Sequence, residues 1–220
     1  IEHMLDEGWD KPGDHSIRDL NGLYQAAKKK FDADPAFAER SRARVVLLQG
    51  GDEKTLSLWR ALIAQSQEHF NEAYRRLGVK LTDGDVRGES FYNPLLAPTV
   101  AELEQKGITR VSDGALCIFP SGFNTKEGEP LPLIIRKTDG GYLYATTDLA
   151  AIKYRVQDVG ANRIVYVTDA RQKQHFAMVF ESARMAGWIP AGVRVEHVPF
   201  GSVMGEDGKP FKTRSGETVR

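Results

Sequence analysis

Three polar clusters in the second half of the 220-residue chain hold the side chains best suited to chemistry. In the first, residues 140–148, Tyr144 and Asp148 are four residues apart and therefore share a face in either a helix or a strand. A carboxylate beside a phenol can accept hydrogen bonds from a cationic ligand. The alternative is that Thr147 or Asp148 only caps the free N–H groups of a helix.

The second cluster, residues 168–175, directly follows the apolar run 163–167. Gln172 and His175 are three residues apart, so they can face one cleft if a helix begins just before them. His175 could hydrogen-bond a nucleotide or be an ordinary, partly exposed histidine. Asp169 could equally be a helix N-cap.

The third cluster is a glycine-bracketed loop, residues 201–216, which contains Lys209 and Lys212. Lysines three residues apart can straddle a polyphosphate, and the glycines allow the loop to move. The spacing differs from that of the GxxxxGK(S/T) phosphate-binding loop. The segment from Glu206 to Lys209 could instead be a plain hairpin turn.

The first half of the chain predicts three helices, because its apolar residues recur at steps of three and four. The first helix is expected to begin at Ser16, and the second at Pro35, a residue favoured at the first helical position. Gly50-Gly51 would end the second helix. The third is expected between Asp52, as its cap, and Gly78, because glycine is favoured just after a helix.

The middle of the chain predicts shorter elements. A short strand is expected over residues 79–82 and a helix from Asn93-Pro94 to Gly107. Two strands, 114–119 and 131–135, flank the polar turn residues 124–130, which predicts a small antiparallel module.

The last eighty residues alternate between strand and helix patterns. Strands are expected over 142–144, 163–167 and 193–198, and helices from Thr146 or Thr147 to Val159 and over 171–186. The run 163–167 is almost wholly apolar, as in a strand buried on both faces. Strands separated by helices pair in parallel, which predicts an α/β nucleotide-binding architecture. Ligands bind beyond the carboxyl ends of such strands, where the three clusters fall.

The composition is that of a neutral globular protein. Lys plus Arg and Asp plus Glu both total 30, hydrophobic residues make up 41% and charged residues 27%. These values argue against a disordered chain and against the overall basic field that marks many nucleic-acid binders. The basic stretches 28–30 and 39–44 fit either a solvated helix face or an RNA backbone contact.

Other residues exclude further classes of protein. The single cysteine, Cys117, excludes an internal disulfide framework, and the histidines lack metal-ligand spacing, so no protein metal site is predicted. No apolar run reaches the roughly 18–20 residues that span a bilayer, and the first residues lack a signal-peptide pattern. We therefore expect a cytoplasmic protein with no membrane partner.

The segment Lys209-Pro-Phe-Lys-Thr213 has the lysine spacing of the KMSKS signature of class I aminoacyl-tRNA synthetases, in a degenerate form. With its surroundings, residues 200–214, it closely resembles bacterial arginyl-tRNA synthetases. The resemblance continues through Leu48 to Glu53, Gly88 to Pro94, Asn124 to Pro130, Gly141 to Asp148, Asp169 to Gln172, and His175. It therefore covers essentially the whole chain.

This resemblance implies a partial Rossmann-like class I catalytic core with a helical insertion and a small β-containing insertion. The expected divisions are 1–92 for the helical part of the core with the first insertion (roughly 10–60), 93–141 for the second, strand-rich insertion, and 142–220 for the second half of the core. No HIGH-type signature is present. We therefore expect an internal piece of the catalytic domain that does not aminoacylate tRNA by itself.

The resemblance also implies roles for the side chains of the first two clusters. Asp148 would pair with the guanidinium of arginine, and Tyr144 and Gln172 would complete the arginine side-chain pocket. A carboxylate suits the planar, five-donor guanidinium and would disfavour lysine. His175 would lie on the ATP side of the site.

In the third cluster, Lys209 and Lys212 would be the catalytic and ATP-binding lysines that steady the pyrophosphate. The substrates implied are arginine, ATP with its Mg²⁺, and tRNA(Arg). Two alternatives stay open: another class I synthetase or nucleotidyltransferase half-domain, and a non-catalytic RNA-binding module derived from a synthetase. The second requires that the basic residues at 28–30 and 40–44 form one exposed face.

Overall fold

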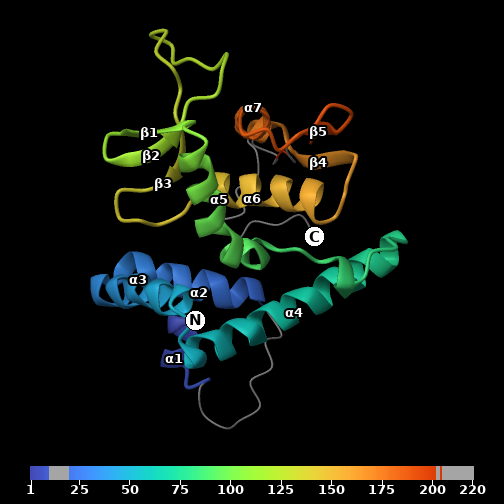
Figure 1. Ribbon diagram of the computed structural model, residues 1–220. Helices are drawn as coiled ribbons and strands as arrows, with labels where there is room; N and C mark the ends of the chain where they lie inside the picture. Colours follow the sequence, from blue (N-terminus) through green and yellow to red (C-terminus); the bar gives the residue numbers. More distant parts are fainter. Residues whose placement is uncertain (10–19, 202–203, 205–220) are drawn as a thin grey trace. The chain divides into compact units, whose positions relative to one another are not determined.

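The computed structural model describes residues 1–9, 20–201 and 204 (Figure 1). These residues group into two compact units. The first unit is Ile1–Val86 together with Met204, and the second is Arg87–Val203.

The first unit is helical. Its elements are α1 (Glu2–Asp6), α2 (Leu20–Ala33), α3 (Pro35–Gln49), α4 (Glu53–Leu77) and the short 3-10 helix η1 (Asp83–Asp85). The three long helices predicted from the apolar spacing are confirmed as α2, α3 and α4. The predicted start of the first of them, at Ser16, lies outside the described residues.

Capping residues fix the ends of these helices. Asp34 accepts hydrogen bonds from two backbone N–H groups in the first turn of α3, which Pro35 opens as predicted. Asp52 accepts a hydrogen bond from the backbone N–H of Thr55 at 2.9 Å, which confirms it as the cap of α4. Gly78 follows α4 in the left-handed region, at φ 68°, where a residue without a Cβ is favoured.

The strand predicted at residues 79–82 is wrong. The N–H of Thr82 donates to Oδ2 of Asp85 at 2.8 Å, and its hydroxyl donates to the same oxygen at 3.0 Å, so this stretch leads into η1. Leu81 is 65% exposed, and no strand lies beside it in the part of the chain that the structure describes. An alternating pattern without a partner strand has no ladder to join.

The second unit combines helices with two sheets. Its elements are η2 (Glu89–Tyr92), α5 (Asn93–Gln105), β1 (Thr109–Ser112), β2 (Ala115–Ile118), β3 (Leu133–Arg136), α6 (Tyr144–Gln157), β4 (Arg163–Asp169), η3 (Ala170–Gln172), α7 (Lys173–Met185) and β5 (Arg194–Phe200). The order β1-β2-β3 forms an antiparallel sheet, and β4 and β5 pair in parallel. Both the antiparallel module and the parallel pairing were predicted and are confirmed.

The polar turn between β2 and β3 is also confirmed. Asn124 and Pro130 form an isolated antiparallel bridge, and the N–H of Thr125 donates to the carbonyl of Glu129 at 2.7 Å. Gly128 has φ 89°, a backbone conformation that residues other than glycine rarely adopt. This loop rises from the sheet in yellow-green in Figure 1.

The strand predicted at 142–144 is wrong, because α6 begins at Tyr144, two or three residues earlier than expected. Only a single bridge, between Arg136 and Tyr142, remains of that strand. The hydroxyl of Thr146 donates to the carbonyl of Ile135, which ties the first turn of α6 to the end of β3. The chain therefore passes from the antiparallel sheet straight into the helix.

The prediction that β4 is buried on both faces is also wrong. Tyr166 packs its ring against Phe176 of α7 at 4.7 Å between centroids, and Ile164 is 6% exposed. Val165 and Val167, on the opposite face, are 43% and 62% exposed. Side chains alternate across a strand, so the helix packed on one face buries only half of this apolar run.

The second unit has one large core and a smaller cluster around Tyr92 and Leu96; the large core joins its sheets and helices. Its fully buried residues come from α5, β2, β3, α6 and α7 and include Leu103, Ile118, Ile135, Leu149 and Val179. The strand-rich segment 93–141 thus shares a core with the helices that follow it. The division at 92/93 and 141/142 stays a prediction about family subdomains.

In the second unit, Cys117 is buried and Glu102 is half-buried. Cys117 is 1% exposed in β2, and burial raises the pKa of its thiol. Glu102 of α5 accepts hydrogen bonds from Nε1 of Trp188 at 2.7 Å and from Lys153 of α6. None of the helices described is both long and apolar enough to cross a membrane.

Candidate functional site

The first turn of α6 presents two side chains of the first polar cluster. Leu143 is extended at φ −114° and ψ 168°, and its carbonyl accepts a hydrogen bond from the N–H of Thr146 at 2.9 Å, which starts the helix. Tyr144 is 63% exposed, and the side chain of Asp148 is 26% exposed. One helical turn therefore places the phenol and the carboxylate on the same face, as the spacing predicted.

The second cluster meets them from the start of α7. Nε2 of His175 lies 2.7 Å from Oδ2 of Asp148, and its ring lies edge-on to Tyr144 with centroids 4.7 Å apart. Asp169 accepts a hydrogen bond from the backbone N–H of Arg171 at 2.8 Å and caps η3, so its alternative role as an N-cap is confirmed. The structure thus joins Tyr144, Asp148 and His175.

Two phenols, the buried Tyr92 and the half-buried Tyr166, lie within electrostatic reach of Asp148. Burial raises the pKa of Tyr166, whose hydroxyl accepts a hydrogen bond from Arg155 at 2.6 Å. Burial also raises the pKa of Tyr92, whose hydroxyl has no hydrogen-bond partner among the residues described. Both phenols therefore stay uncharged near pH 7.

A pocket of about 270 Å³ opens beside the cluster. Its walls are mainly apolar, and the side chains of Tyr144, Gln174 and His175 are its polar groups. The lining residues are Pro132, Leu133, Ile134, Leu143, Tyr144, Ala145, Gln174, His175 and Met178. A concave apolar surface with a few polar groups is typical of a small-molecule site.

The remaining predicted residues are placed differently. Gln172 lies exposed in η3 and makes no hydrogen bond with Tyr144 or Asp148. Lys209 and Lys212 lie outside the described residues. Sequence reasoning missed Gln174 and Met178 as lining residues, although Met178 follows His175 by three residues and so shares its helix face.

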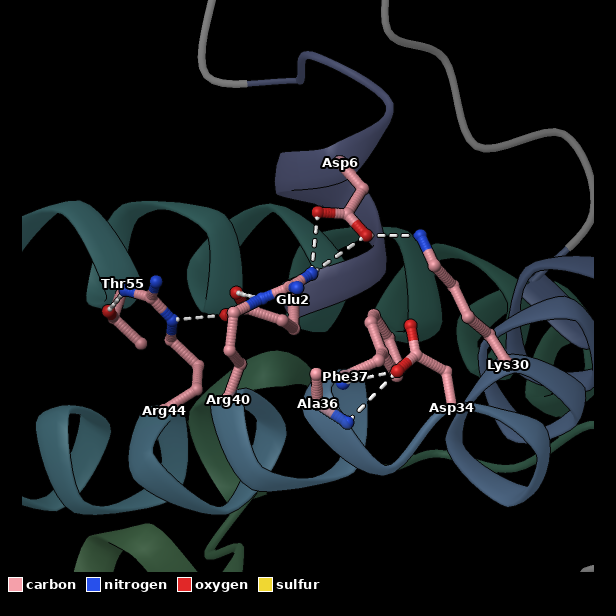
Figure 2. A network of polar contacts seen from close by, with 9 residues as sticks. All are labelled: Glu2, Asp6, Lys30, Asp34, Ala36, Phe37, Arg40, Arg44 and Thr55. Atoms are coloured by element: carbon pink, nitrogen blue, oxygen red, sulfur yellow. Dashed lines mark hydrogen bonds and ion pairs between the residues drawn. The ribbon is translucent and has the colours of Figure 1, made fainter.

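Three basic residues of α2 and α3, Lys30, Arg40 and Arg44, pair with acidic side chains of the first unit (Figure 2). Arg44 Nε lies 2.8 Å from Glu2 Oε2, and Arg40 Nη2 lies 2.9 Å from Asp6 Oδ1. Lys30 also pairs with Asp6 and holds the pKa of that carboxyl below its usual value. These contacts favour a structural role over an RNA-binding face.

Within residues 1–9, 20–201 and 204, no group of three or more His, Cys, Asp or Glu side chains is placed to hold a metal ion.

Comparison with known proteins identifies the class. Residues 1–220 match the family described as "tRNA synthetases class I (R), catalytic domain". An arginine–tRNA ligase of Thermobifida fusca is 54% identical over 221 residues, which cover 100% of this chain and 38% of the relative. That of Nostoc sp. is 57% identical over 204 residues, which cover 93% of this chain and 34% of the relative.

Solved structures agree in fold. Arginyl-tRNA synthetase from Plasmodium falciparum superposes with a TM-score of 0.76 at 29% identity, covering 90% of this chain and 32% of that one. The Thermus thermophilus enzyme, with a TM-score of 0.64 at 18% identity, covers 96% of this chain and 40% of its own and shows likeness of fold alone. The α/β unit is thus part of a class I synthetase catalytic core.

The chain belongs to the family of class I tRNA synthetase catalytic domains of the arginine type. It spans 34% to 38% of the length of the relatives it matches.

Proposed function

We propose that this chain supplies the arginine-binding part of an ATP-dependent arginine–tRNA ligase that acts in the cytoplasm. The observation that carries the proposal is the cluster of Asp148, Tyr144 and His175 at the adjoining starts of α6 and α7. The arginine–tRNA ligases that resemble the chain over 93% to 100% of its length support the choice of amino acid.

Asp148 is the group that reads the substrate side chain. A guanidinium offers five N–H donors in a rigid plane, and a carboxylate can accept two of them in parallel. A lysine ammonium cannot match this fork. The exposed Tyr144 hydroxyl is a further acceptor at the rim, and Gln172 is proposed to approach from η3 when arginine binds.

The proposed chemical step is the activation of the bound arginine by ATP. The carboxylate oxygen of arginine attacks the α-phosphorus of ATP, the bond to the β,γ-diphosphate breaks, and pyrophosphate leaves with the electron pair. Mg²⁺ bound to ATP, together with Lys209 and Lys212, offsets the charge of the leaving group. His175 is proposed to border the nucleotide side, and the aminoacyl group then passes to the 3′ end of tRNA(Arg).

Arginine binding to the chain tests this proposal. Calorimetric titration is expected to show arginine binding and much weaker binding of citrulline, whose neutral urea replaces the guanidinium. Asp148→Asn removes the negative charge and should weaken arginine binding by about 10- to 100-fold, as expected for loss of a charge-assisted hydrogen bond. Binding is the suitable readout because the chain spans about a third of its relatives.

Asp158→Asn is the matched control, since Asp158 is exposed at the other end of α6. It should leave arginine affinity unchanged. Equal binding of arginine and citrulline, or unchanged arginine binding after Asp148→Asn, contradicts the guanidinium assignment.

A further inference from the structure

His175 is fixed against the carboxylate that is proposed to read arginine. It is the third residue of α7, and its side chain is 14% exposed. Its Nε2 atom lies 2.7 Å from Oδ2 of Asp148, which is hydrogen-bond distance. One of the two ring nitrogens of His175 is therefore hydrogen-bonded to an acidic side chain of α6.

We propose that His175 is a positioning residue, which acts on arginine through Asp148 by holding the carboxylate in the plane that a guanidinium requires. The inference rests on the proposed function, because it assigns to His175 a role in recognising the same substrate. It differs from the nucleotide contact expected for this residue from family resemblance.

The hydrogen-bond inventory of Asp148 leaves room for the substrate. Each carboxylate oxygen can accept two hydrogen bonds, so Oδ2 can bind His175 and one guanidinium N–H together. Oδ1 has no hydrogen-bond partner among the residues described. One fixed hydrogen bond thus orients the carboxylate while both oxygens stay able to accept from arginine.

The imidazole is itself held by packing. Its centroid lies 5.1 Å from that of Phe176, which is 4% exposed and belongs to the core of the second unit. The imidazole ring also lies edge-on to the ring of Tyr144, with the two centroids 4.7 Å apart. Packing against the core therefore fixes His175, and His175 in turn fixes Asp148. Arginine binding then does not have to pay the entropy cost of ordering the Asp148 side chain.

Calorimetric arginine titrations of histidine variants test the role. His175→Ala should weaken arginine binding about 10-fold, the size expected for losing one hydrogen bond to a charged group. His175→Gln keeps an N–H donor within reach of Oδ2 and should restore affinity to within about threefold, since little of that hydrogen-bond energy is then lost. His69→Gln changes an exposed histidine of α4 and should have no effect.

A double-mutant cycle separates positioning from a general loss of structure. In the Asp148→Asn background, adding His175→Ala should cost less than about a further twofold, because the residue through which His175 acts is already altered. If the loss of arginine affinity in the double variant equals the product of the losses in the two single variants, the proposal is overturned. Wild-type affinity in His175→Ala overturns it as well.

Nitrogen-15 NMR of the imidazoles gives a readout that needs no arginine. The proton of His175 is expected on Nε2, and the spectrum of this ring should change in Asp148→Asn but not in Asp158→Asn. An unchanged ring spectrum in Asp148→Asn overturns the pairing. If the chain shows the pairing but fails to prefer arginine to citrulline, the proposed function fails and the histidine–carboxylate pair stands.

Discussion

Glu102 is a single side chain that ties three parts of the second unit together. Its carboxylate accepts hydrogen bonds from Trp188, after α7, and from Lys153 of α6, and Lys106 Nζ lies 3.5 Å away. Burial alone would raise the pKa of Glu102, but these donors and cations outweigh it and hold the pKa below its usual range. The ionised form is thus favoured by folding.

A pH-dependent contribution to stability follows. Because the folded-state pKa is lowered, the stabilisation is complete above the unfolded-state value and is lost as the pH falls through the folded-state value. Glu102→Gln should reduce the free energy of unfolding by about 1–2 kcal/mol at pH 7, as for loss of hydrogen bonds to a charged group, and by less near pH 4. Urea unfolding at the two pH values measures both quantities.

Glu104→Gln is the control for Glu102→Gln. Glu104 pairs with Arg136 at 3.4 Å, but both side chains are more than a third exposed. An exposed ion pair contributes less than about 1 kcal/mol. Equal effects of the two substitutions at both pH values would show that the hydrogen bonds of the half-buried Glu102 contribute no more than an exposed ion pair does.

At the scale of elements, helix α4 shows what the sequence could predict. Both its cap, Asp52, and its end, Gly78, follow from local chemistry: an acceptor for the first N–H groups and a residue that tolerates positive φ. The stretch 79–82 and the stretch 142–144 were assigned to strands wrongly, because a strand also needs a neighbour. That information lies in tertiary contacts such as Thr146 with Ile135.

The site shows the same limit. Four-residue spacing predicted that Tyr144 and Asp148 share a face in either a helix or a strand, and the structure places both in α6. The contact between Asp148 and His175 joins residues 27 positions apart, so no local pattern reveals it. Whether Gln172 hydrogen-bonds the carboxylate likewise depends on where η3 gives way to α7, which no local pattern reveals.

Gly78→Ala tests the end of α4. The glycine has φ 68°, and an added Cβ would meet no atom within 4 Å, so the cost is conformational alone. We expect a loss of about 1–2 kcal/mol in the free energy of unfolding, the penalty for left-handed backbone in an L-residue. Circular dichroism during urea unfolding measures it.

Gly88→Ala is the contrasting variant, because Gly88 has φ −67° and also has open space around it. Its stability should be unchanged or slightly raised, since alanine restricts the unfolded chain. A Gly78 variant as stable as the Gly88 variant would contradict the conformational explanation.

At the scale of the whole molecule, the parallel pair β4–β5 has one covered and one open face. Val167 lies opposite Val198 in the register, and both are exposed, at 62% and 46%. Phe200, two residues further along β5, is 53% exposed. Parallel sheets are usually covered on both faces, so this exposed apolar face is unusual for a parallel pair.

The two faces should respond differently to the same change. Val167→Thr keeps the shape and should change the free energy of unfolding by less than about 0.5 kcal/mol, as for a surface site. Ile164→Thr places a hydroxyl on the covered face and should cost about 2 kcal/mol or more. Thermal unfolding by circular dichroism compares them, and a dye that binds apolar surfaces should fluoresce less with Val167→Thr. Equal destabilisation would mean that both faces are packed.

The lone thiol of Cys117 makes this molecule convenient for site-selective labelling. Because its thiol is buried in β2 and its pKa is raised, the reactive thiolate is scarce in the native state. A cysteine introduced at an exposed position such as Lys126 would carry a maleimide dye with the native thiol left in place. The rate at which the buried Cys117 thiol is modified then measures how often β2, the central strand of the antiparallel sheet, opens.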